Sequence, residues 1–244
     1  MEDAERASDA LLDPGSRAKT IPIIVASANS KRSDLSDLSS AERAWLGSSG
    51  FRFGAGEFVL LSDDKGDVSK VVCGGKDDIV GEGASTDGAF SFATLASQLP
   101  DGNYQVAGDV ADEPLIALAW VLGAYSYQRY RAVAESRHCR LKPSTTVDFD
   151  LMNTLASSVY LGRDLINTPA NDLGPDELEA IARALAKAHK ARVSVVTGDD
   201  LISENFPMIH AVGRASSRAP RLVDLSWGNK SHPTVTLVGK GIVG

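Results

Sequence analysis

The sequence predicts an α/β protein made of two α/β segments. Runs with helical periodicity alternate along the chain with short runs rich in β-branched residues, which is typical of α/β folds. The composition, with 43% hydrophobic and 23% charged residues, is that of an ordinary globular protein. A stretch near the middle lacks both periodicities and has the character of a linker, so we expect two domains.

The first 19 residues are polar and acidic, and we expect a flexible tail over residues 1–19. An N-terminal α/β domain is expected over residues 20–137. Its strands are predicted where short apolar runs carry β-branched residues. The predicted strands are Ile21–Ala26, Glu57–Leu61, Ser69–Cys73 and Tyr104–Ala107, and a helix is predicted at Phe90–Leu99.

Three further features of this domain follow from local signals. Ser39 and Glu42 have the spacing of a capping box, in which two side chains satisfy backbone N–H groups at the start of a helix. Residues 74–88 are rich in glycine and aspartate and are expected to form a loop. A long helix is predicted over residues 113–134, with Pro114 in its first turn, where proline is tolerated.

Residues 138–148 are predicted to be a linker, because their Lys-Pro-Ser-Thr-Thr stretch breaks helical and strand patterning. The beginning of a second domain is expected over residues 149–244. Pro175 opens a helix there, and Asp176 and Glu177 favour the positive end of that helix dipole. The other elements are predicted as a helix at Phe149–Leu165, a short helix within Asp199–Phe206, and strands at Arg192–Val196, Leu222–Ser226 and Thr234–Val238.

Composition argues against several classes of partner. The net charge is -7 and the acidic excess lies in the first half, so binding to nucleic acid is not expected. The longest apolar stretch, Leu115–Tyr125, is shorter than the ~20 residues of a membrane helix, so no membrane association is expected. The N-terminus has no apolar signal region, and Cys73 and Cys139 have no metal-binding spacing. We expect a cytoplasmic protein with free thiols, with one disulfide as the alternative.

Few local motifs point to chemistry. Residues 239–244 satisfy GxGxxG after a predicted strand, but the sequence lacks the helix and the acidic residue that dinucleotide binding requires. The four histidines occur singly, which argues against a histidine metal site. The adjacent acids Asp176-Glu177 and Asp199-Asp200 stand at helix starts and are interpreted as capping residues.

Three stretches together resemble one family. Residues 163–175 (RDLINTPANDLGP), 208–222 (MIHAVGRASSRAPRL) and 234–241 (TVTLVGKG) are similar, in order and spacing, to segments of the leucyl aminopeptidases. Residues 118–130 resemble the helix before that family's linker, whereas the first ~110 residues resemble it only weakly. The resemblance implies a macro-like N-terminal α/β domain followed by a mixed-sheet α/β catalytic domain.

The resemblance also implies an activity. Members of this two-metal family remove N-terminal amino acids from peptides with two divalent ions, manganese or zinc, and are expected to assemble as homo-hexamers. Paired ions lower the pKa of a bridging water and polarise the scissile carbonyl. Lys240 matches the position of the family's first metal-binding lysine.

The sequence departs from the family pattern after Ile242. The family continues to Phe-Asp-Ser/Thr-Gly-Gly, whose aspartate binds both metals, whereas here Val243 and Gly244 follow. The other carboxylate ligands, the second lysine and the catalytic arginine lie further on in the family, so no catalytic residue is expected in this chain. We therefore expect a truncated, inactive catalytic domain that binds no metal of its own, whether from a broken reading frame, a gene-model error or a fragment. The alternative is a non-catalytic binding or regulatory module built on the N-terminal domain.

Overall fold

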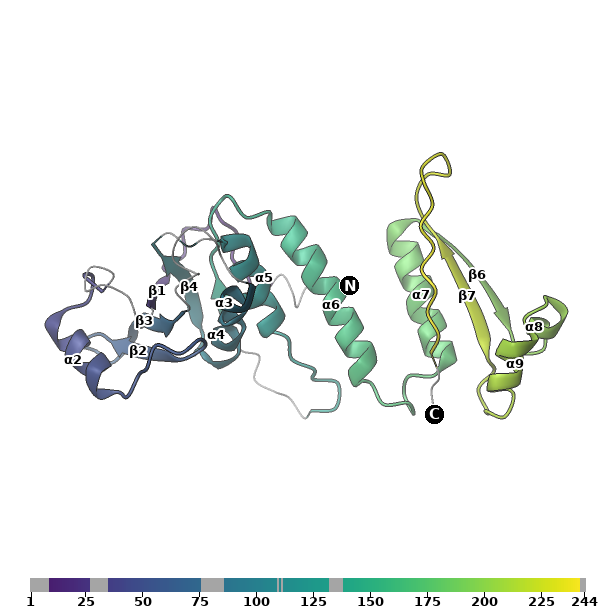
Figure 1. Ribbon diagram of the computed structural model, residues 1–244, viewed down its shortest axis with the longest axis horizontal. Coiled ribbons are helices and arrows are strands. Elements are labelled where there is room, and N and C mark those ends of the chain that lie inside the picture. Colours follow the sequence, from purple (N-terminus) through teal and green to yellow (C-terminus); the bar gives the residue numbers. More distant parts are fainter. Residues whose placement is uncertain are drawn as a thin grey trace. The chain divides into compact units, whose positions relative to one another are not determined.

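The computed structural model describes residues 9–26, 35–75, 86–108, 110, 112–131 and 138–241. The chain divides into two compact units, Met1–Asp164 and Leu165–Gly244. Both combine helices and strands, so the α/β class predicted from the sequence is confirmed (Figure 1). Each unit is considered by itself below.

The first unit is built on a five-stranded mixed sheet with the strand order β2-β3-β1-β4-β5. In this sheet β1 pairs in parallel with β3 and β4, β4 pairs in parallel with β5, and β2 is antiparallel to β3. The strands are β1 (Ile21–Ala26), β2 (Phe58–Ser62), β3 (Val68–Gly74), β4 (Gly102–Ala107) and β5 (Cys139–Leu141). The four strands predicted for this domain are therefore present.

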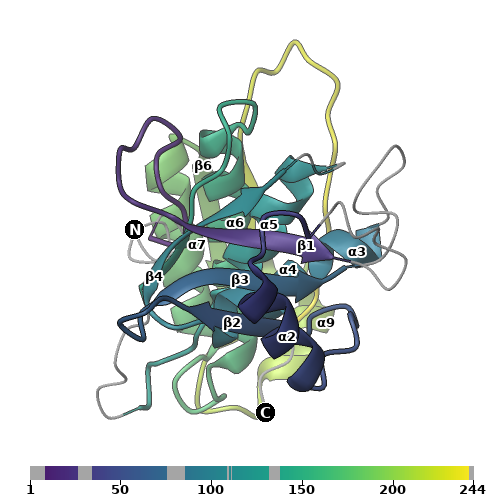
Figure 2. The same cartoon turned by 90° about the vertical axis from the view of Figure 1, so that its left-hand side faces the viewer.

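Helices cover both faces of this sheet. Successive side chains of a strand point to opposite faces, so neighbouring residues of β1 pack into two different cores. Ile23 belongs to the larger core cluster, with side chains of α4 (Phe92–Gln98), α5 (Glu113–Gly123) and α6 (Phe149–Asn167). The adjacent Ile24 belongs to a smaller cluster that includes Leu46 of α2 (Ser40–Ser48). Figure 2 shows α2 in front of β2 and β3, with α5 and α6 behind the sheet. The helices are α2 (Ser40–Ser48), α3 (Thr86–Phe90), α4 (Phe92–Gln98), α5 (Glu113–Gly123) and α6 (Phe149–Asn167).

The predicted capping box at the start of α2 is present. Ser39 Oγ accepts the Glu42 N–H at 3.2 Å, and Glu42 Oε2 accepts the Ser39 N–H at 2.7 Å. Lys70 of β3 also donates to Glu42 Oε1 at 3.0 Å, and so ties α2 to the sheet. Among the helices that the structure describes, none is long and apolar enough to cross a membrane.

The second unit is a helix packed on a two-stranded antiparallel sheet. In this sheet β6 pairs with β7 from Arg192 opposite Ser226 to Thr197 opposite Arg221. Its elements are α7 (Pro175–His189), β6 (Arg192–Thr197), α8 (Asp200–Ser203), α9 (Pro207–Gly213) and β7 (Arg221–Ser226). The predicted start of α7 at Pro175 is confirmed.

The structure differs from the predicted linker and tail. Cys139–Leu141 forms a strand, because these three residues pair with β4 and bury Cys139 and Leu141. Leu11 is buried as well and bridges to Leu141, so the predicted flexible tail is ordered from there. Residues 1–8 lie outside the described part of the chain. The helix α6 buries its inner face in the core of the first unit, and the two compact units divide after Asp164.

Two predicted elements are shorter or missing. The helix α5 ends at Gly123 instead of about residue 134. The chain at Gly123 lies close to the Ala93 backbone, since a Cβ added to Gly123 would lie 2.2 Å from the Ala93 carbonyl oxygen. Residues 132–134 lie outside the described range, as do most of the predicted loop at 74–88 and the last three residues. Thr234–Val238 is an exposed irregular segment, so the strand predicted there is wrong. Among the described residues β6 and β7 pair only with each other, and this segment has no strand to pair with.

Candidate functional site

Lys240, the predicted metal ligand, lies in the exposed irregular segment that follows β7. Its neighbours Gly239 and Gly241 stand in open space, since a Cβ added to either would meet no atom within 4 Å. Among the described residues, no three His, Cys, Asp or Glu side chains lie close enough together to hold a metal ion. The residues that the structure describes therefore do not form the two-metal site that the resemblance implies.

The segments that carry the resemblance do meet elsewhere in the second unit. Arg218, from the stretch before β7, reaches the loop before α7 and the first turn of that helix. Its guanidinium donates to Glu177 Oε2 at 2.5 Å and to the Asn171 carbonyl oxygen at 2.9 Å, and it lies 3.6 Å from Asp176 Oδ1. Arg218 thus contacts three residues, one in the loop before α7 and two in its first turn, which lie about forty positions earlier in the chain.

Gly174 makes this close approach possible. A Cβ at residue 174 would lie 2.0 Å from Nη1 and 2.6 Å from Cδ of Arg218, so only glycine leaves room for the guanidinium. The Gly174 N–H donates to Glu177 Oε2 at 2.6 Å, which satisfies a backbone group at the start of α7. The same carboxylate therefore caps the helix and pairs with Arg218. Its predicted capping role is present, and its ion pair was not predicted.

A second ion cluster lies further along the same helix. Arg221 at the start of β7 donates to Glu179 Oε2 at 2.6 Å, and Arg183 donates to Glu179 Oε1 at 2.7 Å. The hydrogen bonds from Arg183 and then Arg221 lower the pKa of Glu179 and keep it ionised. Both carboxylate oxygens are occupied by guanidinium groups, so this carboxylate holds α7 to β7 and is not available as a ligand or base.

The first two residues of the 163–175 motif have an anchoring role in the first unit. Arg163 Nη1 donates to the Leu122 carbonyl oxygen at 2.6 Å, and its guanidinium lies 5.2 Å from the ring centroid of Tyr125. The Tyr125 hydroxyl donates to Asp164 Oδ1 at 2.7 Å. These contacts fasten the end of α6 to the end of α5, which the sequence alone did not indicate.

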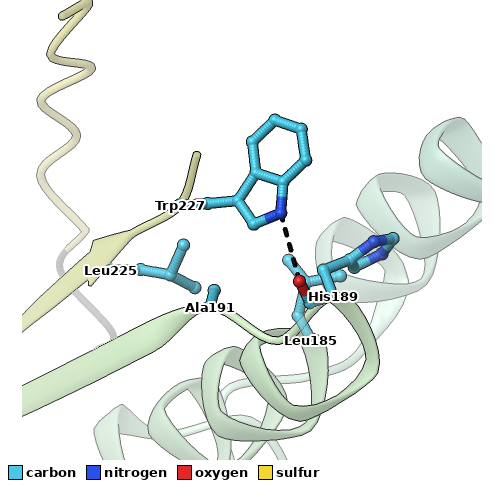
Figure 3. Close-up of a pocket in the computed structure, with 5 residues that line it drawn as sticks. All are labelled: Leu185, His189, Ala191, Leu225 and Trp227. Carbon is cyan, nitrogen blue, oxygen red and sulfur yellow. Dashed lines mark hydrogen bonds between the residues drawn. The ribbon is translucent and has the colours of Figure 1, made fainter. Parts of the chain in front are cut away.

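A small apolar pocket opens where α7 ends and the two strands of the second unit begin and end. Figure 3 shows its lining residues, with the Trp227 indole donating to the His189 carbonyl oxygen at 3.1 Å. Its volume is about 290 Å³, at the small end for ligand sites. The lining residues are Leu185, His189, Ala191, Leu225 and Trp227. This lining offers apolar contact but no convergent set of polar or acidic groups for catalysis.

Comparison with known families agrees with the stretches identified in the sequence. Residues 21–141 match the model of the M17 aminopeptidase N-terminal domain. Residues 160–243 match the model of the catalytic domain of the cytosol aminopeptidase family. The two matches follow each other in the order of the family and include Lys240 in the second.

Individual relatives give the same result. The chain is 32% identical over 186 residues to a probable cytosol aminopeptidase of Corynebacterium diphtheriae, and 32% identical over 187 residues to one of Brucella anthropi. Among solved structures it resembles a cytosol aminopeptidase of Coxiella burnetii, with 31% identity and a TM-score of 0.77 over 89% of this chain. The bottromycin maturation enzyme BotP in complex with Mn is similar in fold, with 20% identity, a TM-score of 0.67 and coverage of 87% of this chain.

These relatives are longer than this chain. The aligned part covers 37% of the Corynebacterium protein and 36% of the Brucella protein. It covers 46% of the Coxiella structure and 46% of the BotP structure. The chain thus spans about a third of the length of the curated relatives it matches and just under half of these solved structures.

Proposed function

The chain belongs to the cytosol aminopeptidase family M17, and on that basis we propose that its 244 residues make up the N-terminal domain and the first part of the catalytic domain of a metal-dependent aminopeptidase. The observation that carries this proposal is the match of both domain models, in order, to one chain. The complete enzyme would hydrolyse peptides and release their N-terminal amino acids. Its proposed cofactors are two divalent ions, manganese or zinc, with Lys240 as one ligand.

We further propose that these residues alone neither bind the two ions nor turn over peptides. A two-ion site needs several converging ligands, and among the described residues no three His, Cys, Asp or Glu side chains gather into a group that could hold a metal ion. The names of the relatives support a cytoplasmic location, and a homo-hexamer is proposed for the complete enzyme.

The first test uses this chain as it stands. We expect no hydrolysis of leucine p-nitroanilide with Mn²⁺, Zn²⁺ or Co²⁺ above a blank preparation. We also expect Lys240→Ala to leave the calorimetric affinity for Mn²⁺ and Zn²⁺ unchanged. Metal-dependent turnover, or tight zinc binding that is lost in the variant, would show that the chain assembles a site by itself.

The second test asks whether the chain contributes to an aminopeptidase at all. Genomic DNA beyond codon 244 is read in all three frames for a sequence that encodes Phe-Asp-Ser/Thr-Gly-Gly. A longer chain that includes the encoded motif is then expressed and assayed with the same substrate and metals. Metal-dependent hydrolysis that disappears in Lys240→Ala supports the proposal. Absence of the motif, or a longer product without turnover, supports the non-catalytic module instead.

A further inference from the structure

In the first unit, the edge of β5 that faces away from β4 is covered by a short segment that precedes β1. The backbone groups of alternate residues in a strand point to its two edges, and those of Leu141 point away from β4. The Leu141 N–H donates to the Ala10 carbonyl oxygen at 3.0 Å, and the Leu12 N–H donates to the Leu141 carbonyl oxygen at 2.8 Å. Residues 9–16, which we call the strap, thus extend the sheet by a short added strand.

The strap also completes the core of the first unit. Leu11 lies opposite Leu141 in a parallel bridge, and Leu11 and Ala10 are each only 4% exposed. Both side chains belong to the larger core cluster. If the strap were lifted, this part of the core would face water and the outward backbone groups of Leu141 would lose their partners. The outer edge of β5 therefore needs an occupant.

Basic side chains hold the strap at both of its ends. Arg140 Nε donates to the Asp9 carbonyl oxygen at 3.1 Å, and the Arg140 guanidinium lies 3.5 Å from Asp9 Oδ1. Lys142 Nζ donates to the Ser16 carbonyl oxygen at 2.7 Å. The contacts of the strap define what this edge recognises, which is an extended peptide whose acidic residue precedes small and branched apolar residues.

The strap is attached less extensively than the strands of the sheet. It pairs with β5 through one isolated bridge, whereas β5 pairs with β4 over three residues. Pro14 has no N–H to continue the pairing, and the Ser16 N–H donates to the Asp13 carbonyl oxygen at 2.9 Å to close a turn. The strap also lies outside residues 21–141, which match the family's N-terminal domain model. Such a segment can open while the sheet stays intact.

We propose that the outer edge of β5 is a binding site for an extended acidic and apolar peptide of another protein, and that the strap is the occupant built into this chain. The peptide adds to the sheet as a strand parallel to β5, a known mode of peptide recognition. It takes the bonds to Leu141 and Arg140 and fills the space of Leu11. The strap competes for the same edge and so limits access to it. This proposal is independent of peptidase activity.

The first experiment measures hydrogen exchange of single amides in the native chain by NMR. Opening of the strap exposes the Leu12 and Leu141 amides. The Gly102 and Lys142 amides bond across the pairing of β4 with β5 and stay protected. After correction for intrinsic rates, the first pair is expected to exchange at least tenfold faster than the second. Equal protection of the two pairs would mean that the strap opens only with the whole sheet, which contradicts the proposal.

The second experiment measures binding of a fluorescein-labelled peptide of residues 8–17 (SDALLDPGSR) to the full chain by fluorescence anisotropy. Leu11→Gln in the chain weakens the strap, so the dissociation constant of the peptide is expected to fall at least tenfold relative to the native chain. Arg17→Gln introduces the same side chain at an exposed position just after the strap and should leave the dissociation constant unchanged. Circular dichroism melting checks that each variant is folded.

Two controls locate the peptide on the edge of β5. A peptide that carries glutamine in place of Leu11 should bind the Leu11→Gln chain at least tenfold more weakly than the native peptide. Adding Arg140→Ala to the Leu11→Gln chain should also weaken binding, because Arg140 holds the acidic residue.

Three binding results would overturn the proposal. One is no binding of the peptide to the folded Leu11→Gln chain up to about 1 mM. Another is equal affinity of the native and Leu11→Gln chains, which means that the strap does not compete for the site. The third is binding that Arg140→Ala leaves unchanged, which places the peptide on another surface. The exchange measurement needs no variant, so it decides the question even if Leu11→Gln prevents folding.

Discussion

Replacement of Gly174 by alanine tests the contact that joins the two motifs of the second unit. The φ angle of Gly174 is -100°, which any residue adopts, so the substitution brings no backbone strain. Its effect comes from the new Cβ, which would lie 2.0 Å from Nη1 and 2.6 Å from Cδ of Arg218. The guanidinium must move away, because the helix start is held by the capping carboxylate of Glu177.

The magnitude follows from the bonds that Arg218 then gives up. These are the 2.5 Å bond to Glu177 Oε2 and the 2.9 Å bond to the Asn171 carbonyl oxygen. A hydrogen bond with a charged partner contributes about 1.5–3 kcal/mol when buried, and a surface ion pair about 0–1 kcal/mol. The side chains of Arg218 and Glu177 are 35% and 38% exposed, so we expect Gly174→Ala to destabilise the unit by about 1–2 kcal/mol.

Arg218→Ala removes the same hydrogen bonds and should lower the stability of the second unit by a similar amount. Once the arginine is absent, the alanine at residue 174 meets no guanidinium, and its remaining cost is that of an alanine N-cap, about 0.5 kcal/mol. The two substitutions are therefore strongly non-additive, with a coupling of about 1 kcal/mol in the double-mutant cycle. Gly239→Ala, where a Cβ meets nothing within 4 Å, is the matched control and should change little.

Hydrogen exchange of the β6 and β7 amides measures the opening free energy of the second unit, with the β1 and β3 amides of the first unit as an internal reference. Gly174→Ala should accelerate exchange in β6 and β7 and leave β1 and β3 unchanged. The result that would refute this reasoning is a Gly174→Ala destabilisation that is the same in the Arg218→Ala background as in the native chain, within about 0.3–0.5 kcal/mol. The close approach to Arg218 would then not be the cause of the destabilisation.

Two further outcomes are expected in the first unit. The pKa of Glu42 is lowered by the Ser39 backbone hydrogen bond and by Lys70, so its ionised form stabilises the fold above the unfolded pKa. The stability difference between the native chain and Glu42→Gln, from urea denaturation, should therefore shrink as the pH falls below 4.5, and a pH-independent difference would contradict this. Tyr160→Phe removes the buried 2.5 Å hydrogen bond to the Val121 carbonyl oxygen and should cost about 1 kcal/mol in urea denaturation; an unchanged unfolding midpoint would refute that contribution.

Elements with local signals were predicted well from the sequence. The capping box of Ser39 and Glu42 and the proline at residue 175 mark helix starts through contacts within one turn, so the short stretch of sequence contains all the partners. The β-branched runs of β1, β3 and β6 likewise predicted strands from the local sequence. Family membership was also readable, because it rests on motifs in linear order.

The candidate site shows the limit of such reasoning. Lys240 was identified from a motif, but a metal site depends on several groups that converge in space, and its role as a ligand stays a prediction. Arg218 was part of a recognised stretch, yet nothing in the sequence indicated that it pairs with Glu177, because the two lie 41 positions apart. The pairing of Arg221 with Glu179 could not be predicted from the sequence for the same reason, since these residues lie 42 positions apart.

The sequence by itself thus determined the α/β class, the family and the starts of α2 and α7. Only the tertiary structure decided that Cys139–Leu141 is a strand, that α6 belongs to the first core, and that Thr234–Val238 is not a strand. The physical reason is the range of the interactions. Caps and periodicity act over a few residues, whereas strand pairing and burial depend on partners that the chain brings together from far apart.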